Sequence, residues 1–170
     1  MPIKRIIEYL DSNNIKYVTI RHSAAFTAQE VAASAHVPGK ELAKTVLIKL
    51  DGKMAMAVLP ASDKIDFDLL RNATKVENIR LAYEQEFIDK FSDCEVGAMP
   101  PFGNLYGMEV YVSKSLTKDE EIAFNACSHS LLIKLQYKDY ERLVKPKILE
   151  FTYKSMLWLI AFAQGKNNLF

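Results

Sequence analysis

Residues 45–59, TVLIKLDGKMAMAVL, carry the clearest signal of the fold. Two apolar runs, 45–50 and 54–59, flank Asp51-Gly52, a dipeptide that suits a tight hairpin turn. Neither run alternates strictly between apolar and polar residues, which is typical of strands covered on both faces. The sequence therefore predicts a β-hairpin inside a sheet.

Helices and strands are interspersed on either side of this hairpin. Apolar residues recur at helical spacing within the first ten residues, and Thr27 with Glu30 forms a capping-box pattern. Further helices are predicted over residues 27–35, 66–73, 83–91 and 137–144, and further strands over residues 17–20, 109–112, 121–125 and 130–136. This mixture predicts an α/β (α+β) fold, a single domain with a mixed, mostly antiparallel sheet flanked by helices.

A chain of 170 residues fits one domain, and its 49% hydrophobic content is enough to build a core. We expect this domain over residues 1–148 and a C-terminal tail over residues 149–170. Met156, Leu157, Ile160 and Ala161 have helical spacing, so the tail is predicted to form a helix. Packing against the domain's own core is favoured over a dimer or partner contact.

The charge balance limits the possible partners. Lys and Arg number 22 and Asp and Glu 21, a formal net charge of +1. That value argues against coating long nucleic-acid duplexes but allows a small phosphate site. The N-terminus lacks the apolar core of a signal peptide, and the longest nearly apolar stretch, 156–163, is shorter than the roughly 20 residues that span a bilayer. We therefore expect a cytoplasmic protein that contacts no membrane.

The two cysteines, Cys94 and Cys127, are too few for a disulfide framework, and with three scattered histidines they show no metal-ligand spacing. We expect no metal. Cys127 and His129 admit a thiol nucleophile with an imidazole base. However, residues two apart on a strand share a face without having to share a hydrogen bond, and a buried cysteine is usually a small hydrophobe. A thiol-dependent hydrolase is therefore the lesser alternative.

Motifs of other enzyme classes are missing from the sequence. It contains no G-x-x-x-x-G-K-[ST], G-x-G-x-x-G or G-x-S-x-G segment. These absences count against ATP-driven, nicotinamide-dependent and serine-hydrolase chemistry.

The segment GAMPPFG, residues 97–103, is the most unusual loop. Its two prolines fix φ and remove two donors, while its glycines allow close backbone approach or positive φ. Such a loop can aim its remaining N–H groups at a carbonyl or an anion, although its composition alone favours a plain connecting turn. Lys44, at the entrance of the first hairpin strand, could bind a phosphate as a point charge or remain solvated.

Three segments, LAKTVL (42–47), GAMPPFG (97–103) and FNACSH (124–129), occur in an order and spacing that resemble the YbaK-like aminoacyl-tRNA deacylases. This family also occurs as an editing domain inserted in bacterial prolyl-tRNA synthetases, and the resemblance covers about residues 1–148. It implies a freestanding hydrolase without a metal or cofactor. Its substrate would be proline tRNA mischarged with a small amino acid such as alanine or cysteine. A synthetase pocket rejects ligands of similar or smaller size poorly, so a second sieve is needed.

The resemblance also implies roles for individual residues. Lys44 would hold the phosphate or ribose of the terminal adenosine, and His129 would position the aminoacyl group or the attacking water. Backbone N–H groups of the loop shaped by Gly97, Pro101 and Gly103 would polarise the ester carbonyl. The other residues placed around the substrate are Ala98, Met99, Phe102, Cys127 and Ser128.

Two departures from the family pattern bear on specificity. Relatives often carry glycine at the position of Cys127 and a small residue at that of Pro100.

The expected partner is the 3′ acceptor end of an aminoacyl-tRNA, with prolyl-tRNA synthetase or an elongation factor supplying further affinity. The alternative on the same fold is a non-catalytic module that binds aminoacyl-tRNA or a nucleotide.

Overall fold

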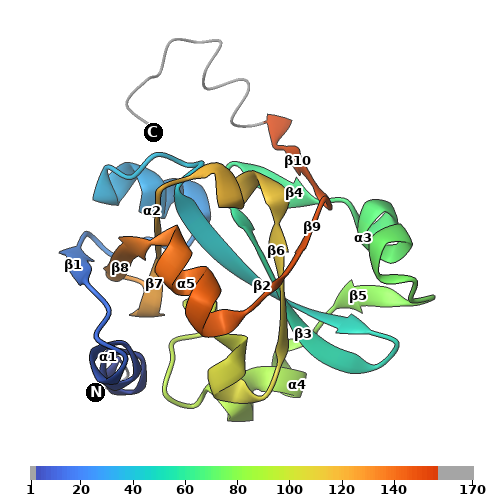
Figure 1. The fold of residues 1–170 in the computed structure, drawn as a ribbon, viewed down its shortest axis with the longest axis horizontal. Coiled ribbons are helices and arrows are strands. Elements are labelled where there is room, and N and C mark those ends of the chain that lie inside the picture. The colour runs from blue at the N-terminus through green and yellow to red at the C-terminus, as the bar shows by residue number, and fades with distance from the viewer. Residues whose placement is uncertain (1–2, 157–170) are drawn as a thin grey trace.

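The structure is a computed structural model and describes residues 3–156 (Figure 1). An eight-stranded mixed sheet has the order β1-β8-β7-β2-β3-β6-β9, with β5 also paired to β2, and β4 and β10 form a separate pair. The strands are β1 (Tyr17–Arg21), β2 (Leu42–Leu50), β3 (Lys53–Pro60), β4 (Asp63–Ile65), β5 (Ile79–Leu81), β6 (Glu109–Ser113), β7 (Glu121–Ser128), β8 (Leu131–Gln136), β9 (Lys147–Leu149) and β10 (Thr152–Lys154). The α-helices are α1 (Lys4–Ser12), α2 (Ala28–Ala35), α3 (Phe67–Thr74), α4 (Glu84–Phe87) and α5 (Tyr137–Val144).

The predicted hairpin is confirmed as β2 and β3. Leu50 pairs with Lys53 across the turn, and Asp51 and Gly52 have φ of 47° and 83°. Positive φ at both turn residues fits a two-residue hairpin turn whose twist matches the strands. The hairpin lies between β7 and β6, so its interior position is confirmed.

The sheet is mixed, as predicted. β2 with β7, β3 with β6 and β6 with β9 are parallel, and the remaining strand pairs are antiparallel. The mixed, mostly antiparallel sheet flanked by helices is therefore confirmed.

Side chains of β2 alternate between the two faces of the sheet. Ala43 and Leu47 belong to a cluster that includes residues of α1 and α5, and α5 lies across the front of the sheet in Figure 1. Leu42 packs with residues of α2, and Ile48 packs with Leu70 of α3. Because successive strand residues point to opposite faces, Lys44 lies on the face covered by α2 and α3.

One predicted helix is broken. The segment 83–91 forms only α4, and a 3₁₀ turn, Ile88–Phe91, follows it. Phe87 and Phe91 reach the core, but Ile88 is exposed, so the segment lacks the apolar face of a longer helix. Four strands of three residues each, β4, β5, β9 and β10, were not predicted, because strands this short have little pattern of their own.

Part of the predicted tail packs against the domain. Phe151 is fully buried in the α3 cluster, and β10 pairs with β4. The helix predicted in the tail lies, beyond Met156, outside the described residues.

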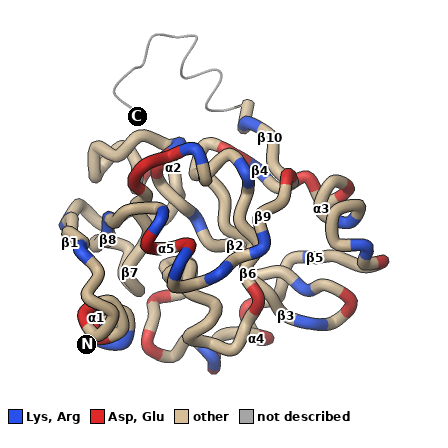
Figure 2. Tube along the Cα trace, viewed as in Figure 1, with Lys and Arg blue, Asp and Glu red and all other residues tan. Residues whose placement is uncertain are grey.

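Acidic and basic residues are interspersed along the trace (Figure 2), in line with the small net charge. Within residues 3–156, no helix is long and apolar enough to cross a membrane.

Candidate functional site

The candidate site lies where β2 separates from β7, a place we call the β2–β7 split. The two strands pair only at Leu42 with Ala123 and at Ala43 with Phe124. Further along β7 a different segment replaces β2. The N–H of Glu95 donates to the Cys127 carbonyl (3.0 Å), and the N–H of Cys127 donates to the Ala98 carbonyl (3.0 Å). The start of the glycine and proline loop is thus held against the edge of β7.

A β-bulge ends β7 at this point. The register with β8 shifts between Asn125 and Ser128, and Cys127 has a left-handed φ of 63°. A bulge bends its strand and redirects the side chains that follow. The hydroxyl of Ser128 accepts from the N–H of Ser130 (3.2 Å), which closes the turn around His129.

The imidazole of His129 is fixed by the loop. Its Nε2 lies 2.7 Å from the Val96 carbonyl oxygen, and its backbone N–H donates to Glu95 Oε2 at 2.7 Å. Since a carbonyl only accepts, Nε2 carries the proton, and in the neutral ring Nδ1 is left with a lone pair. Nδ1 is buried and has no hydrogen-bond partner among the described residues, and the ring of Phe26 lies 4.8 Å away. The site therefore offers an oriented but unused acceptor.

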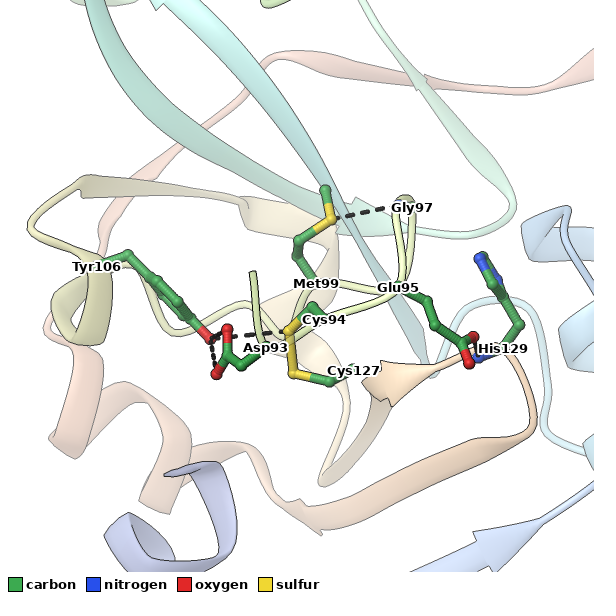
Figure 3. Close-up of a disulfide and its surroundings, with 8 residues drawn as sticks. All are labelled: Asp93, Cys94, Glu95, Gly97, Met99, Tyr106, Cys127 and His129. Carbon is green, nitrogen blue, oxygen red and sulfur yellow. Dashed lines mark hydrogen bonds between the residues drawn. A yellow bond between two sulfur atoms is a disulfide. The ribbon is translucent and has the colours of Figure 1, made fainter. Parts of the chain in front are cut away.

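Gly97 brings the loop backbone close to this imidazole (Figure 3). Its φ is +87°, and a Cβ built on it would lie 3.4 Å from His129 Cε1. Its N–H donates to the Met99 Sδ at 3.3 Å. A thioether is a weak acceptor, so a substrate carbonyl would be a better partner for this N–H.

The second half of the loop is buried in the core. Phe102 is fully buried, and its ring lies 5.3 Å from those of Phe124 and Tyr140. The Tyr140 hydroxyl donates to the Pro101 carbonyl at 2.8 Å. A Cβ on Gly103 would lie 2.6 Å from Val110 Cγ2. In the structure these loop residues hold the loop in place by packing.

Lys44 reaches the β2–β7 split from the other strand. It directly follows the last paired residue of β2, as Asn125 follows that of β7, so the parallel register puts both side chains on one face. Lys44 lines a hollow of about 310 Å³ whose other lining residues are Val46, Leu59, Lys64, Ile65, Phe67, Leu81 and Tyr153. Burial lowers the pKa of Lys44, Asp63 opposes this shift, and Lys64 adds to it. Neither loop residues nor His129 line this hollow.

Asn125 is a polar residue at the split that was not among the predicted site residues. Its Oδ1 is buried without a hydrogen-bond partner among the described residues. It stands within the FNACSH segment, so a signal was present, but the unmet acceptor depends on the separation of two distant strands.

The cysteines differ from expectation. Cys94 and Cys127 form a disulfide, although 33 positions separate them in the sequence. A disulfide sulfur has no thiolate, so Cys127 in this state does not serve as the nucleophile of a thiol-dependent hydrolase. The expectation of unpaired cysteines was wrong, because neither composition nor local spacing reveals that the loop packs against the end of β7.

Only one cluster among residues 3–156 could hold a metal ion. It consists of Asp93, Cys94 and Cys127. While the two sulfurs are bonded to each other they cannot both act as thiolate ligands.

Comparisons with known proteins identify the family of this chain. A family model described as "Aminoacyl-tRNA editing domain" matches residues 22–143, well over half of the chain. The chain is 25% identical over 153 residues to the multifunctional Ser/Thr-tRNA deacylase ProXp-y of Escherichia coli (strain K12), covering 87% of this chain and 91% of that protein. It is 27% identical over 148 residues to the prolyl-tRNA editing protein ProX of Acetoanaerobium sticklandii, covering 82% and 88%.

Solved structures show the same fold. A crystal structure described as that of a candidate trans-editing enzyme for prolyl tRNA synthetase superposes with a TM-score of 0.77. It covers 89% of this chain and 97% of that one, at 15% identity. At this identity the likeness concerns the fold alone.

Proposed function

The chain belongs to the aminoacyl-tRNA editing domain family, and we propose that it hydrolyses the ester between a mismatched amino acid and the 3′ end of a tRNA. Two groups at the start of the loop carry this proposal: His129 Nδ1, which is oriented but has no partner among the described residues, and the Gly97 N–H, whose acceptor among them is a thioether. Both are groups that an aminoacyl ester and an attacking water would use.

In the proposed reaction the Gly97 N–H leaves Met99 and donates to the ester carbonyl. As the water oxygen attacks the carbonyl carbon, negative charge builds on the carbonyl oxygen, and the N–H stabilises it. His129 Nδ1 accepts a hydrogen bond from the water or from the neighbouring ribose hydroxyl and so orients it. The ester C–O bond then breaks, and the proton given up by the attacking water passes to the ribose oxygen, so the products are the free amino acid and a ribose hydroxyl.

Lys44 has a binding role in this proposal. Its ammonium lies on a partly buried face and would bind the phosphate or ribose of the terminal adenosine. Asn125, on the same face, would donate or accept one further hydrogen bond. Ser128, which is partly exposed, borders the aminoacyl group, whereas Ala98 is fully buried and supports the loop from inside; no metal takes part.

The proposed substrate carries a small amino acid. Alanine or cysteine on proline tRNA is the first choice, and the name of the Escherichia coli relative adds serine and threonine. Since the net charge is only +1, we propose recognition of the acceptor end. A synthetase or an elongation factor would then supply the remaining tRNA affinity.

The direct test is deacylation of a panel in which alanine, cysteine, serine, threonine and proline are each esterified to proline tRNA. Release of one or more small amino acids, with cognate proline spared, would support the proposal. If no substrate is hydrolysed while a non-hydrolysable aminoacyl-adenosine analogue still binds, the non-catalytic binding module is the correct alternative.

The role of Lys44 is tested by Lys44→Ala, with Lys49→Ala as the matched control. Lys49 is on the same strand but pairs with Glu86 at 3.1 Å, and it points to the opposite face. We expect kcat/KM to fall at least tenfold in Lys44→Ala and to stay within twofold in Lys49→Ala. Equal rates in the two variants would remove Lys44 from the site.

A further inference from the structure

The disulfide joins the two segments that build the candidate site. Cys94 precedes Glu95, which contacts both the Cys127 carbonyl and the His129 N–H. Cys127 lies two residues before His129 and is hydrogen-bonded to Ala98. Figure 3 shows the S–S bond beside these contacts, with Gly97 and Met99 further along the loop. A covalent bond here decides whether the loop and the turn can separate.

The two sulfurs differ in exposure. Cys127 is 1% exposed, whereas Cys94 is only partly buried and precedes the exposed residues Glu95, Val96 and Gly97. A small oxidant dissolved in water therefore reaches Cys94 first. The buried Cys127 thiol lies where it can then form the disulfide with Cys94.

The surroundings of Cys94 are polar. The Tyr106 hydroxyl lies 3.8 Å from its sulfur and 3.3 Å from Asp93 Oδ2. Burial, followed by the charge of Asp93, raises the pKa of Tyr106 to about 12, so the hydroxyl keeps its proton at neutral pH. The hydroxyl donates to Asp93 in the structure, and by turning it can donate instead to a sulfur that carries negative charge, a charge that Asp93 opposes.

The backbone at Cys127 has a second unusual property. Its φ of 63° is a left-handed conformation that costs most side chains roughly 1 kcal/mol and costs glycine little. A cysteine here places its sulfur on that of Cys94, a contact that glycine could not make.

We propose that Cys94 and Cys127 are a reversible redox pair whose oxidation locks the loop residues 94–99 onto the turn that carries His129. The Cys94 thiolate attacks hydrogen peroxide, so that an S–O bond forms and the O–O bond breaks, and the hydroxide that leaves takes up the proton released by the Cys94 thiol to become water. The Cys127 thiol then attacks that sulfur, the S–S bond forms, and the S–O bond breaks with loss of a second water. A dithiol reductant reverses the change and is itself oxidised to a disulfide.

A reversible bond fits the expected setting better than a permanent one. The sequence predicts a cytoplasmic protein, and in that compartment disulfides are mostly transient. In the reduced state non-covalent contacts hold the loop to the turn: backbone hydrogen bonds and the contacts of His129 with Glu95 and Val96. Oxidation adds a link across 33 positions and removes the freedom to separate.

The test uses the full chain, first reduced with dithiothreitol and then treated with hydrogen peroxide or oxidised glutathione. We expect both thiols to become resistant to alkylation, a crosslinked 94–127 peptide to appear in mass spectra, and dithiothreitol to restore both thiols. The oxidised form should melt roughly 5–15 °C higher. Its amide hydrogens at residues 95–99 should exchange at least tenfold more slowly.

Cys94→Ser is the control, because it removes the more exposed partner and leaves the buried one in place. In this variant the shifts in melting temperature and amide exchange between the two treatments should disappear. None of these readouts depends on deacylation, so the redox proposal and the proposed function can fail separately.

Three results would overturn the proposal. The first is that both thiols remain open to alkylation after oxidation. The second is a disulfide that dithiothreitol does not reduce under native conditions, which would make the bond a permanent structural one. The third is that the reduced protein binds one zinc ion through Asp93 and both cysteines, which would make the pair a metal site.

Discussion

The loop 97–103 consists of two halves that have different surroundings. At its start Gly97 is exposed, its φ is positive, and its neighbours hold the imidazole of His129. At its end Phe102 and Gly103 are fully enclosed by the core. The comparison indicates that one half is placed to contact substrate and the other fixes where the first half lies. Substitutions in the two halves should therefore separate activity from stability.

The largest expected effect is on stability, from Phe102→Ala. Phe102 is fully buried between Phe124 and Tyr140, so its removal leaves a cavity. We expect the free energy of unfolding to fall by about 3–5 kcal/mol, measured by urea denaturation. A loss below 1 kcal/mol would show that the second half is not an anchor.

The two glycines give the sharpest comparison. In Gly103→Ala the new Cβ would meet Val110 Cγ2 at 2.6 Å and the Met108 carbonyl oxygen at 2.8 Å, so the strands or the loop must shift. We expect a loss of about 2–3 kcal/mol in the free energy of unfolding. In Gly97→Ala the new Cβ would meet only the edge of His129. The free energy of unfolding should fall by about 1 kcal/mol, because the φ at this position is positive. If Gly97→Ala proves the more destabilising, the assignment of the two halves is reversed.

Tyr140→Phe tests the hydrogen bond that holds the second half. It deletes the hydroxyl that donates to the Pro101 carbonyl and leaves the ring in place. An unpaired buried carbonyl costs about 1–2 kcal/mol, so the free energy of unfolding, measured by thermal denaturation, should fall by that amount. Tyr137→Phe is the control, because the Tyr137 hydroxyl reaches only Glu141, at 3.4 Å. Equal losses in the two variants would indicate that the Pro101 contact has no special role.

The smallest effect concerns Asp119, two residues before β7, the strand on which the start of the loop rests. Burial raises the pKa of Asp119 to about 6, with Lys40 opposing and Glu41 adding to the shift. Between about pH 4 and 6 the folded state binds more protons than the unfolded state, so stability falls as the pH rises. Asp119→Asn should raise the free energy of unfolding by about 1 kcal/mol at pH 7, after discounting for partial exposure, and should leave it unchanged at pH 4.

Glu120→Gln, a substitution at the exposed neighbouring position, is the control for Asp119→Asn. It should leave the pH dependence of unfolding unchanged. A gain in Asp119→Asn that is the same at pH 4 and pH 7 would contradict the raised pKa.

Local patterns predicted much of the fold. The hairpin, the capping box at Thr27 and the apolar stripe of α1 each depend on neighbouring residues, and each is confirmed. The broken helix after Tyr83 and the three-residue strands depend on tertiary partners. No local window contains those partners.

The candidate site divides in the same way. Lys44, Gly97 and His129 were identifiable from their segments, and they remain predictions for the roles assigned to them. The hydrogen bond from His129 to Val96, the unmet acceptor of Asn125 and the Cys94–Cys127 bond arise only when distant segments meet at the end of β7.

The most direct measurement is single-turnover deacylation of the best substrate in the panel by the wild type, Gly97→Ala and His129→Ala, with melting temperatures recorded in parallel. If the start of the loop and the imidazole form the hydrolytic site, His129→Ala should lose about 100-fold in rate. Gly97→Ala keeps its N–H, but a Cβ at this positive φ and beside His129 would displace it, so this variant should lose at least tenfold, and both should remain folded at the assay temperature. Wild-type rates in both folded variants would contradict hydrolysis at this site.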